Sequence, residues 1–264
     1  MITDKKKLNI LLLGKKSWAA KALNYLIERE HNVVTVVAKD PCDELDRVNG
    51  TLHEAAHQHN IPVLNMKELN NEIIKNKLNN VDLVISYLFW MKVKEPLLSL
   101  GKLGAINFHP APLPEYKGLG GYNAAILDNK TEYGVTAHFM NELIDEGPII
   151  KCKRFNIDQI NETAFSLERK SQEAMFELFK EVISDFENDM VLVEETPKEK
   201  GVYINRTKFE EMKLINPNDP TEIIERKIRA FWFPPFEGAK LKVGEKYYTL
   251  IDNNLLKEIS HRLN

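Results

Sequence analysis

The stretch Leu8-Asn9-Ile10-Leu11-Leu12-Leu13-Gly14 gives the first indication of the fold. It is a nearly continuous apolar run that ends in glycine, which is typical of a strand buried on both faces of a parallel sheet. A helix is expected directly after it, because Ser17 is a candidate N-cap and apolar residues recur at helical spacing from Ala19 to Ile27. A buried strand followed by an amphipathic helix is the first half of a strand–helix–strand unit.

The same alternation continues outward along the chain. We expect strands at 33–38, 61–64, 81–87, 104–108, 134–140 and 148–157, with helices at 52–59, 68–78, 93–100, 122–127 and 164–186. The last helix is long and amphipathic, so one of its faces packs on the sheet. Strands that alternate with helices favour right-handed crossovers. The predicted fold class is therefore α/β, with a Rossmann-like, mostly parallel sheet flanked by helices.

The character of the sequence changes near residue 190. Short strand-like pieces follow at 191–193 and 202–204, then a helix at 222–231 and a hairpin that turns at Val243-Gly244-Glu245. This pattern indicates a small C-terminal α+β extension. We predict a catalytic domain over residues 1–190 and a small region over residues 191–264 that contributes to acceptor binding.

Side chains suited to catalysis gather where the strand at 104–108 ends. Asn107 and His109 are two residues apart, so on an extended strand both point to the same face, and Pro110 then stops the strand. Sites in open α/β sheets lie beyond the carboxyl ends of the strands. With Asp145 arriving from a later loop, the set suits acyl transfer: an amide to hold an oxyanion, an imidazole to move a proton and a carboxylate to orient the imidazole. Asn-x-His alone is also a common way to end a strand.

The wider pattern around these residues resembles a known family. It comprises Asn107-x-His-Pro-x-x-Leu-Pro-x-x-x-Gly118, then Gly134-Val135-Thr136-Ala137-His138-Phe139, then Asp145-x-Gly147-Pro148. Together these segments resemble the signature of the 10-formyltetrahydrofolate-dependent formyltransferases, which act on glycinamide ribonucleotide, methionyl-tRNA or nucleotide sugars. The resemblance extends loosely from residue 8 to about residue 155. It implies the formyltransferase fold, and it implies that Asn107, His109 and Asp145 are catalytic.

The resemblance also implies a co-substrate and the residues that hold it. Members of the family use 10-formyltetrahydrofolate, and the resemblance places the pterin pocket after the strand at 81–87. No metal is expected. The candidate cofactor-binding residues are Tyr87, Leu88, Phe89, Trp90, Met91 and Ile144.

The C-terminal part indicates the acceptor. The run Arg229-Ala230-x-x-Phe233-Pro234-Pro235-x-Glu237-Gly238-Ala239 resembles the tail of formyltransferases that act on nucleotide-linked amino sugars, although such aromatic clusters also pack cores. The implied acceptor is the amine of a nucleotide-linked deoxyamino sugar, dTDP-4-amino-4,6-dideoxyglucose or its 3-amino isomer, used in surface polysaccharide or O-antigen synthesis. The glycine-rich turn at 118–121 is either a flexible turn or a place where a ligand approaches the backbone closely. The candidate substrate-binding residues are Gly120, Tyr122, Asn123, Tyr203, Arg206, Arg229 and Trp232.

Several alternatives remain open at this stage. The acceptor is alternatively methionyl-tRNA or glycinamide ribonucleotide. The chain is alternatively a hydrolase that deformylates the folate, or a noncatalytic protein that binds a sugar nucleotide or folate. His53-Glu54-Ala55-Ala56-His57 also spells the H-E-x-x-H of zinc peptidases, but no third ligand motif follows it, so solvated helix histidines are the preferred interpretation.

Composition excludes several other classes. The formal net charge is -3 and the pI is about 6.2, so there is no global basic footprint for nucleic acid. Cys42 and Cys152 form neither a disulfide framework nor a four-thiolate zinc site. No stretch approaches the roughly 20 apolar residues that span a membrane, and the charged start does not fit a signal peptide. We expect a cytoplasmic protein with small-molecule partners only, and the resemblance adds a homodimer.

Overall fold

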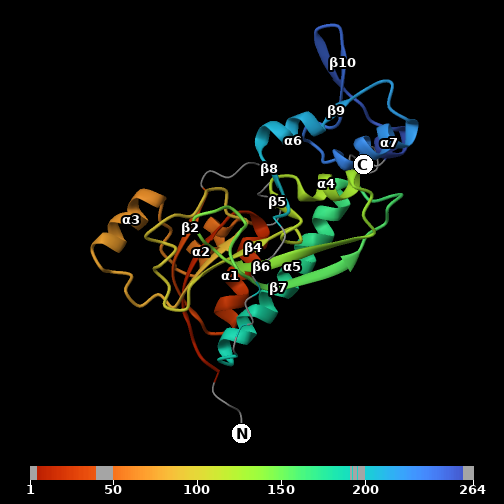
Figure 1. Cartoon of the computed structure of the whole chain (residues 1–264). Coiled ribbons are helices and arrows are strands. Elements are labelled where there is room, and N and C mark those ends of the chain that lie inside the picture. Colours follow the sequence, from red (N-terminus) through yellow and green to blue (C-terminus); the bar gives the residue numbers. More distant parts are fainter. Residues whose placement is uncertain (1–4, 40–49, 191, 193–194, 196–199, 258–264) are drawn as a thin grey trace. The chain divides into compact units, whose positions relative to one another are not determined.

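The structure is a computed structural model, and it describes residues 5–39, 50–190, 192, 195 and 200–257. The chain forms two compact units (Figure 1). Unit 1 takes the described residues within Met1–His109, Val135–Lys153 and Ala174–Lys198, and unit 2 takes those within Pro110–Gly134, Arg154–Glu173 and Glu199–Asn264. Cys42 lies outside the described residues. The part of the chain that is described contains no helix with the length and apolar character needed to cross a membrane.

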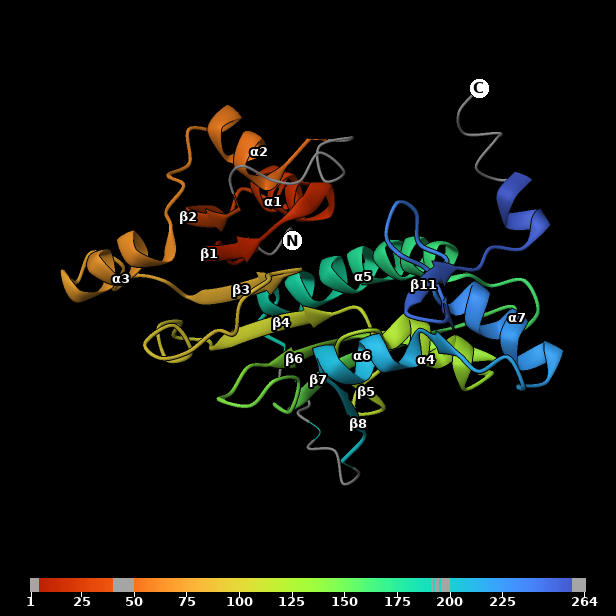
Figure 2. The same cartoon turned by 90° about the horizontal axis from the view of Figure 1, so that it is seen from above.

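A six-stranded sheet forms the centre of unit 1, in the order β2-β1-β3-β4-β6-β7. The first four of these strands are parallel, and β6 runs antiparallel to β4 (Figure 2). The fold class predicted from the sequence is therefore confirmed. The strand bounds are β1 Asn9–Gly14, β2 Asn32–Ala38, β3 Leu83–Tyr87, β4 Ala105–His109, β6 Glu132–Phe139 and β7 Ile149–Asn156.

Helices cover both faces of this sheet. They are α1 Lys16–Glu28, α2 Leu52–Gln58, α3 Met66–Ile74 and α5 Ala164–Glu187. On one face Phe179 of α5 packs against Tyr87 and Phe108, with ring centroids 5.5 and 5.0 Å apart. On the other face Leu69 of α3 joins a cluster with Val84. Successive strand residues point to opposite faces, so every residue of β3 is buried, as the apolar runs predict.

Three local predictions were wrong. Residues 61–64 form only an isolated bridge between Val63 and Val36, because Pro62 has no N–H for a ladder. Residues 93–100 form turns, because Pro96 interrupts the helical pattern. Ser17 lies inside α1, whose N-cap is Lys15 without a side-chain hydrogen bond. The strand expected at 191–193 falls outside the described residues, apart from Leu192.

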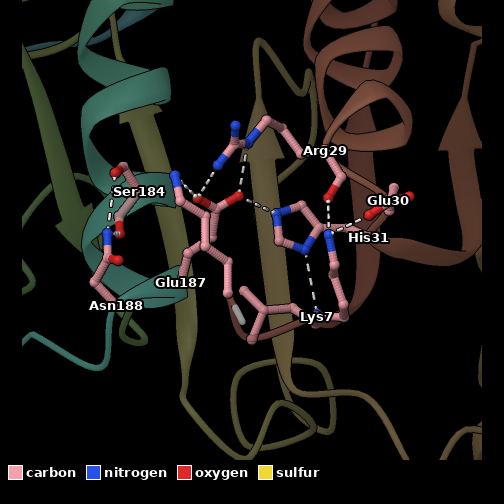
Figure 3. Close-up of polar contacts among 9 residues, drawn as sticks. Lys7, Arg29, Glu30, His31, Ser184, Glu187 and Asn188 are labelled. Carbon is pink, nitrogen blue, oxygen red and sulfur yellow. Dashed lines mark hydrogen bonds and ion pairs between the residues drawn. The ribbon is translucent and has the colours of Figure 1, made fainter. Parts of the chain in front are cut away.

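A buried carboxylate fastens the end of α5 to the amino ends of β1 and β2 (Figure 3). Glu187 accepts from Nε and Nη2 of Arg29 at 2.9 and 2.5 Å, and its Oε1 is 3.1 Å from His31 Nε2. The backbone N–H of Leu8 donates to His31 Nδ1 at 3.2 Å, so Nε2 carries the proton of the neutral ring. We call Arg29, His31 and Glu187 the amino-edge cluster.

Burial and charge act in opposite directions on the pKa values of the amino-edge cluster. Burial lowers the pKa of His31 and outweighs the attraction of Glu187. Burial acts to raise the pKa of Glu187, but hydrogen bonds from Arg29 and the charge of Arg29 hold that pKa below its usual value. The cluster therefore contains a neutral histidine beside an ion pair.

Unit 2 contains small sheets and short helices. Strands β5 Tyr116–Gly118 and β8 Val202–Ile204 pair in parallel, and a three-stranded sheet has the order β11-β10-β9. The hairpin that contains β10 extends beyond α6 and α7 (Figure 1). The helix predicted at 222–231 and the final hairpin are confirmed, whereas β5, α6 and β9 were not predicted. The remaining bounds are α4 Gly121–Leu127, α6 Arg206–Met212, β9 Leu214–Ile215, α7 Thr221–Ala230, β10 Lys240–Val243 and β11 Lys246–Thr249.

The compact units differ from the domains predicted from the sequence. Residues 110–134 and 154–173 group with residues 199–264 rather than with the rest of the first 190 residues. Strands β6 and β7 and helix α5 each contribute residues to both units. The boundary near residue 190 stays a prediction.

Candidate active site

Asn107 and His109 lie at the carboxyl end of β4, as the sequence pattern indicates. Asn107 is half-buried and His109 is 7% exposed. In the antiparallel pairing with β6, Asn107 lies opposite His138, and His109 lies opposite Thr136. The polar residues of the two strands therefore share one face of the sheet.

Asp145 comes close to both histidines from the loop between β6 and β7. Its Oδ2 is 3.6 Å from His109 Nδ1, and its Oδ1 is 3.7 Å from His138 Nε2. The side chain of Asp145 is 9% exposed, so its charge acts over these distances with little screening by solvent. Its backbone has a φ of 55°, in the left-handed region that Asp tolerates better than most residues. The structure thus brings Asn107, His109 and Asp145 together.

Two residues that sequence reasoning did not single out hold the amide of Asn107. Ser86 on β3 donates from Oγ to Asn107 Oδ1 at 2.7 Å, and Asn107 Nδ2 is 3.1 Å from His138 Nε2. Ser86 is 4% exposed and His138 is 2% exposed. The sequence pattern could have indicated His138, because Thr136 and His138 are two residues apart on β6 and so point to the same face of the sheet. Ser86 was the only polar residue in the apolar run of β3.

The loop that carries Asp145 is closed by backbone contacts. The N–H of Phe139 donates to the carbonyl of Pro148 at 2.9 Å. A Cβ added at Gly147 would lie 1.7 Å from the carbonyl oxygen of Phe139, so only glycine fits at this position. The same carbonyl accepts from Nδ1 of His138 at 2.8 Å. One backbone group therefore contacts both the His138 ring and the Asp145 loop.

The candidate folate-binding residues of unit 1 differ in exposure. The side chain of Tyr87 is fully buried among Phe108 and Phe179, and its hydroxyl has no partner among the described residues. Burial raises the pKa of Tyr87. The next residue, Leu88, has a φ of 58°. Beyond it the rings of Phe89 and Trp90 lie 4.6 Å apart, and Trp90, Met91 and Ile144 are exposed.

The candidate substrate-binding residues of unit 2 fall into two groups. Asn123 donates to the carbonyl of Ala230 at 2.6 Å, Arg229 donates to that of Glu162 at 2.9 Å, and Trp232 is buried. Burial lowers the pKa of Arg229. These three side chains stabilise unit 2 itself. The indole N–H of Trp232 has no partner among the described residues.

The second group lies nearer the surface of unit 2. The side chain of Arg206 is 79% exposed, and Tyr203 is 47% exposed. Gly120 has a φ of 67°, and the ring of Phe209 lies against it. Tyr122 packs on Tyr133 with ring centroids 5.8 Å apart.

The H-E-x-x-H segment lies on α2. The rings of His53 and His57 are 4.5 Å apart, but Glu54 accepts from the backbone N–H of Thr51 in a capping box. The described residues contain no group of three or more His, Cys, Asp or Glu side chains that could hold a metal ion. Glu54 therefore caps its helix, and a zinc-peptidase site has no third ligand in the described part of the chain.

Comparison with known proteins identifies the family of the chain. The formyl transferase family model matches residues 6–183. A methionyl-tRNA formyltransferase from Ehrlichia canis is 29% identical over 251 residues, which cover 91% of this chain and 81% of the relative.

Two solved structures share the fold. One is an N-formyltransferase from Helicobacter canadensis in complex with folinic acid and dTDP-3-aminofucose, with a TM-score of 0.73, 24% identity, and coverage of 90% of this chain and 85% of that chain. The other is a 4-N formyltransferase from Francisella tularensis, with a TM-score of 0.75, 20% identity, and coverage of 93% and 97%. These likenesses concern the fold, whereas the family model covers more than half of the sequence. The chain therefore belongs to the formyl transferase family, and it is a formyltransferase.

Proposed function

We propose that this enzyme transfers a formyl group from 10-formyltetrahydrofolate to the amine of a nucleotide-linked deoxyamino sugar. The observation that carries the proposal is the joint placement of Asn107, His109 and Asp145 at the carboxyl end of β4 in a chain of this family. The sugar acceptor is supported by the resemblance of the Arg229–Ala239 tail. It is also supported by the Helicobacter canadensis N-formyltransferase, which shares the fold and whose structure is a complex with folinic acid and dTDP-3-aminofucose. We propose that the reaction takes place in the cytoplasm.

The folate is proposed to bind beside the carboxyl ends of β3 and β4. Tyr87 pairs with Phe108 across these strands, so the segment that follows Tyr87 begins at the same edge of the sheet as His109. Exposed apolar side chains of Trp90, Met91 and Ile144 suit a flat heterocycle, because they offer stacking surface. Tyr87 contributes through its backbone, since its side chain is in the core.

The proposed reaction begins when the neutral amine attacks the formyl carbon. A C–N bond forms, and the carbonyl oxygen becomes an oxyanion that the N–H of Asn107 stabilises. His109 accepts the proton that the amine loses, directly or through water, as the bond from the formyl carbon to folate N10 breaks and N10 takes up a proton. The negative charge of Asp145, 3.6 Å away, stabilises the positive charge that develops on His109.

A substrate panel tests this function. Purified enzyme is given 10-formyltetrahydrofolate with dTDP-4-amino-4,6-dideoxyglucose or its 3-amino isomer, and mass spectrometry detects the added formyl group. Asn107→Ala serves as the negative control for contaminating activity. No product with any amino-sugar nucleotide would contradict the sugar acceptor, and formate release without an acceptor would indicate a folate hydrolase.

Methionyl-tRNA is the second candidate acceptor. The Ehrlichia canis relative carries that name at 29% identity, a higher identity than that of either compared structure. The same panel therefore includes methionyl-tRNA and glycinamide ribonucleotide. Formylation of the tRNA at a higher kcat/KM than the amino sugars would replace the sugar proposal.

Two further parts of the proposal concern organisation. The region 191–264 contributes to acceptor binding, with the exposed Tyr203 and Arg206 as its contacts. Loss of sugar affinity in Tyr203→Ala and Arg206→Ala, with folate affinity unchanged, is the expected result.

A homodimer stays a prediction, and sedimentation equilibrium measures it.

A further inference from the structure

A chain of hydrogen bonds crosses three neighbouring strands beside the candidate active site. It starts at the carbonyl of Phe139 on β6, passes through His138 and the amide of Asn107 on β4, and ends at the hydroxyl of Ser86 on β3. The strand register places these side chains opposite one another, with Ser86 beside Asn107 and Asn107 beside His138. The donor–acceptor distances are 2.8, 3.1 and 2.7 Å in that order.

The direction of every bond in this chain follows from its first member. A carbonyl oxygen only accepts, so Nδ1 of His138 carries the proton of the neutral ring and Nε2 is an acceptor. The group of Asn107 that faces Nε2 must then be the NH2 group. The amide oxygen consequently faces Ser86, whose hydroxyl donates.

The amide of Asn107 is thus held at both of its ends. One N–H of Nδ2 is directed to His138, and the amide carries a second N–H on the same nitrogen. Rotation of the amide by a half turn would bring its oxygen against the Nε2 lone pair and its NH2 group against the Ser86 hydroxyl. The amide would then carry an oxygen, which cannot donate, at the position that the NH2 group now occupies.

We infer that Ser86 is a positioning residue for the formyl-transfer reaction, because its hydroxyl fixes Asn107 in the orientation that presents an N–H to the oxyanion. This inference rests on the proposed function of Asn107. Ser86 is 4% exposed, so bulk water does not take the place of its hydroxyl. Ser86 acts through Asn107 and not on the substrate, so its loss slows the chemical step while substrate binding is retained.

The test compares Ser86→Ala with Ser86→Thr, which restores a hydroxyl at the same position. The matched control is Thr35→Val on β2, two strands away. Thr35 is 2% exposed and donates its hydroxyl to the carbonyl of Pro62 at 2.9 Å, so this variant also loses one buried hydroxyl bond in the same sheet. Each variant is measured for kcat, both KM values and Tm.

A second measurement does not depend on catalysis. The side-chain amide of Asn107 gives a pair of signals in 15N NMR spectra of the substrate-free protein, assigned by their absence from Asn107→Asp. The expected result is that Ser86→Ala shifts these signals and lowers kcat about tenfold or more, with KM values unchanged. Ser86→Thr is expected to recover most of the rate, and Thr35→Val to leave both readouts at wild-type values.

Two outcomes would overturn the inference. One is a Ser86→Ala variant with wild-type kcat and unmoved Asn107 signals. The other is an equal loss of kcat in Thr35→Val, which would indicate general loosening of the sheet. If the wild-type enzyme formylates no acceptor, the proposed function fails, and the Asn107 signals still decide whether Ser86 orients the amide.

Discussion

Histidine lies beside a carboxylate at both ends of the strands of the central sheet in unit 1, but at different distances. We call the side where the parallel strands begin the amino edge and the side where they end the carboxyl edge. At the amino edge Glu187 contacts His31 at 3.1 Å and Arg29 at 2.5 and 2.9 Å, and its side chain is 1% exposed. At the carboxyl edge Asp145 is 3.6 and 3.7 Å from His109 and His138. The short contacts satisfy a buried charge, so the removal of one partner would destabilise the fold. At the longer distances the carboxylate of Asp145 acts on both imidazoles through its charge.

The largest expected effect is the loss of activity in Asn107→Ala. Removal of an oxyanion donor lowers kcat by about 10²–10³-fold, because the charge that develops in the transition state loses a preorganised partner. The kinetic assay with 10-formyltetrahydrofolate and the amino-sugar acceptor measures this change. Asn188→Ala is the matched control. Asn188 donates to the carbonyl of Ser184 at the end of α5, away from the carboxyl end of β4. A near-normal kcat in Asn107→Ala would remove Asn107 from the proposed mechanism.

Glu187→Ala is expected to change stability instead of catalysis. Arg29 and His31 lose their common acceptor, and breaking a buried ion pair from one side costs about 3 kcal/mol in the free energy of unfolding. Urea unfolding measures this change. Glu181→Ala is the control, because its ion pair with Lys153 is exposed and worth less than about 1 kcal/mol. Equal destabilisation in the two variants would show that burial does not distinguish Glu187.

A smaller effect is expected in the pH dependence of stability. Burial lowers the pKa of His31 in the folded protein, so below about pH 6.5 the unfolded chain binds a proton that the folded chain does not. Stability therefore falls as the pH decreases from about 6.5 to the lowered pKa of His31. The carboxylate of Glu187, whose pKa is lowered in the fold, contributes stability above about pH 4.5 that is lost at still lower pH.

Thermal unfolding of His31→Gln across this range tests the assignment. Glutamine does not titrate. Between about pH 6.5 and about pH 4.5, stability is therefore expected to fall less in this variant than in the wild type. His59→Gln is the control, because His59 is exposed beside Asn24. An unchanged pH dependence in His31→Gln would locate the titrating group elsewhere.

The smallest effect is expected for Tyr87→Phe. Its hydroxyl is buried without a partner among the described residues, so removing it costs no hydrogen bond and relieves an unsatisfied polar group. The free energy of unfolding is expected to stay the same or rise by up to about 1 kcal/mol. Tyr116→Phe is the contrasting variant, because that hydroxyl donates to Asp128 at 2.8 Å and its loss is expected to destabilise. A clear destabilisation by Tyr87→Phe would mean that its hydroxyl has a partner.

Local periodicity was enough to predict most of the sheet and its helices. The apolar run that ends at Gly14 forms β1, and the helical spacing of apolar residues that ends near Glu187 forms α5. Both patterns involve only residues that are close together in the sequence. Prediction failed where a proline removed a donor inside an apolar pattern, at Pro62 and Pro96. It also missed β5 and β9, which carry too few residues for a period to be recognised, and α6, in which no residue is buried.

The site was predicted less completely, for a different physical reason. Asn107 and His109 follow from one strand end. Asp145 was added from a later loop, and the family resemblance implied that all three are catalytic. The contacts of Ser86 and His138 depend on the register of three strands that are distant in sequence, which no local pattern contains. Sequence also did not distinguish aromatic and polar side chains that pack inward, such as Tyr87 and Asn123, from those that stay exposed, such as Tyr203.

The most direct test of the contrast between the two edges is the rate of formyl transfer, per folded molecule, in His109→Ala and Glu187→Gln measured beside the wild type. Circular dichroism at the assay temperature gives the folded fraction of each variant. The expected result is that His109→Ala loses most of the rate, while Glu187→Gln retains nearly all of it despite a lower Tm. A His109→Ala variant that formylates the acceptor at a near-wild-type rate would contradict the assignment of the carboxyl edge as the reaction centre.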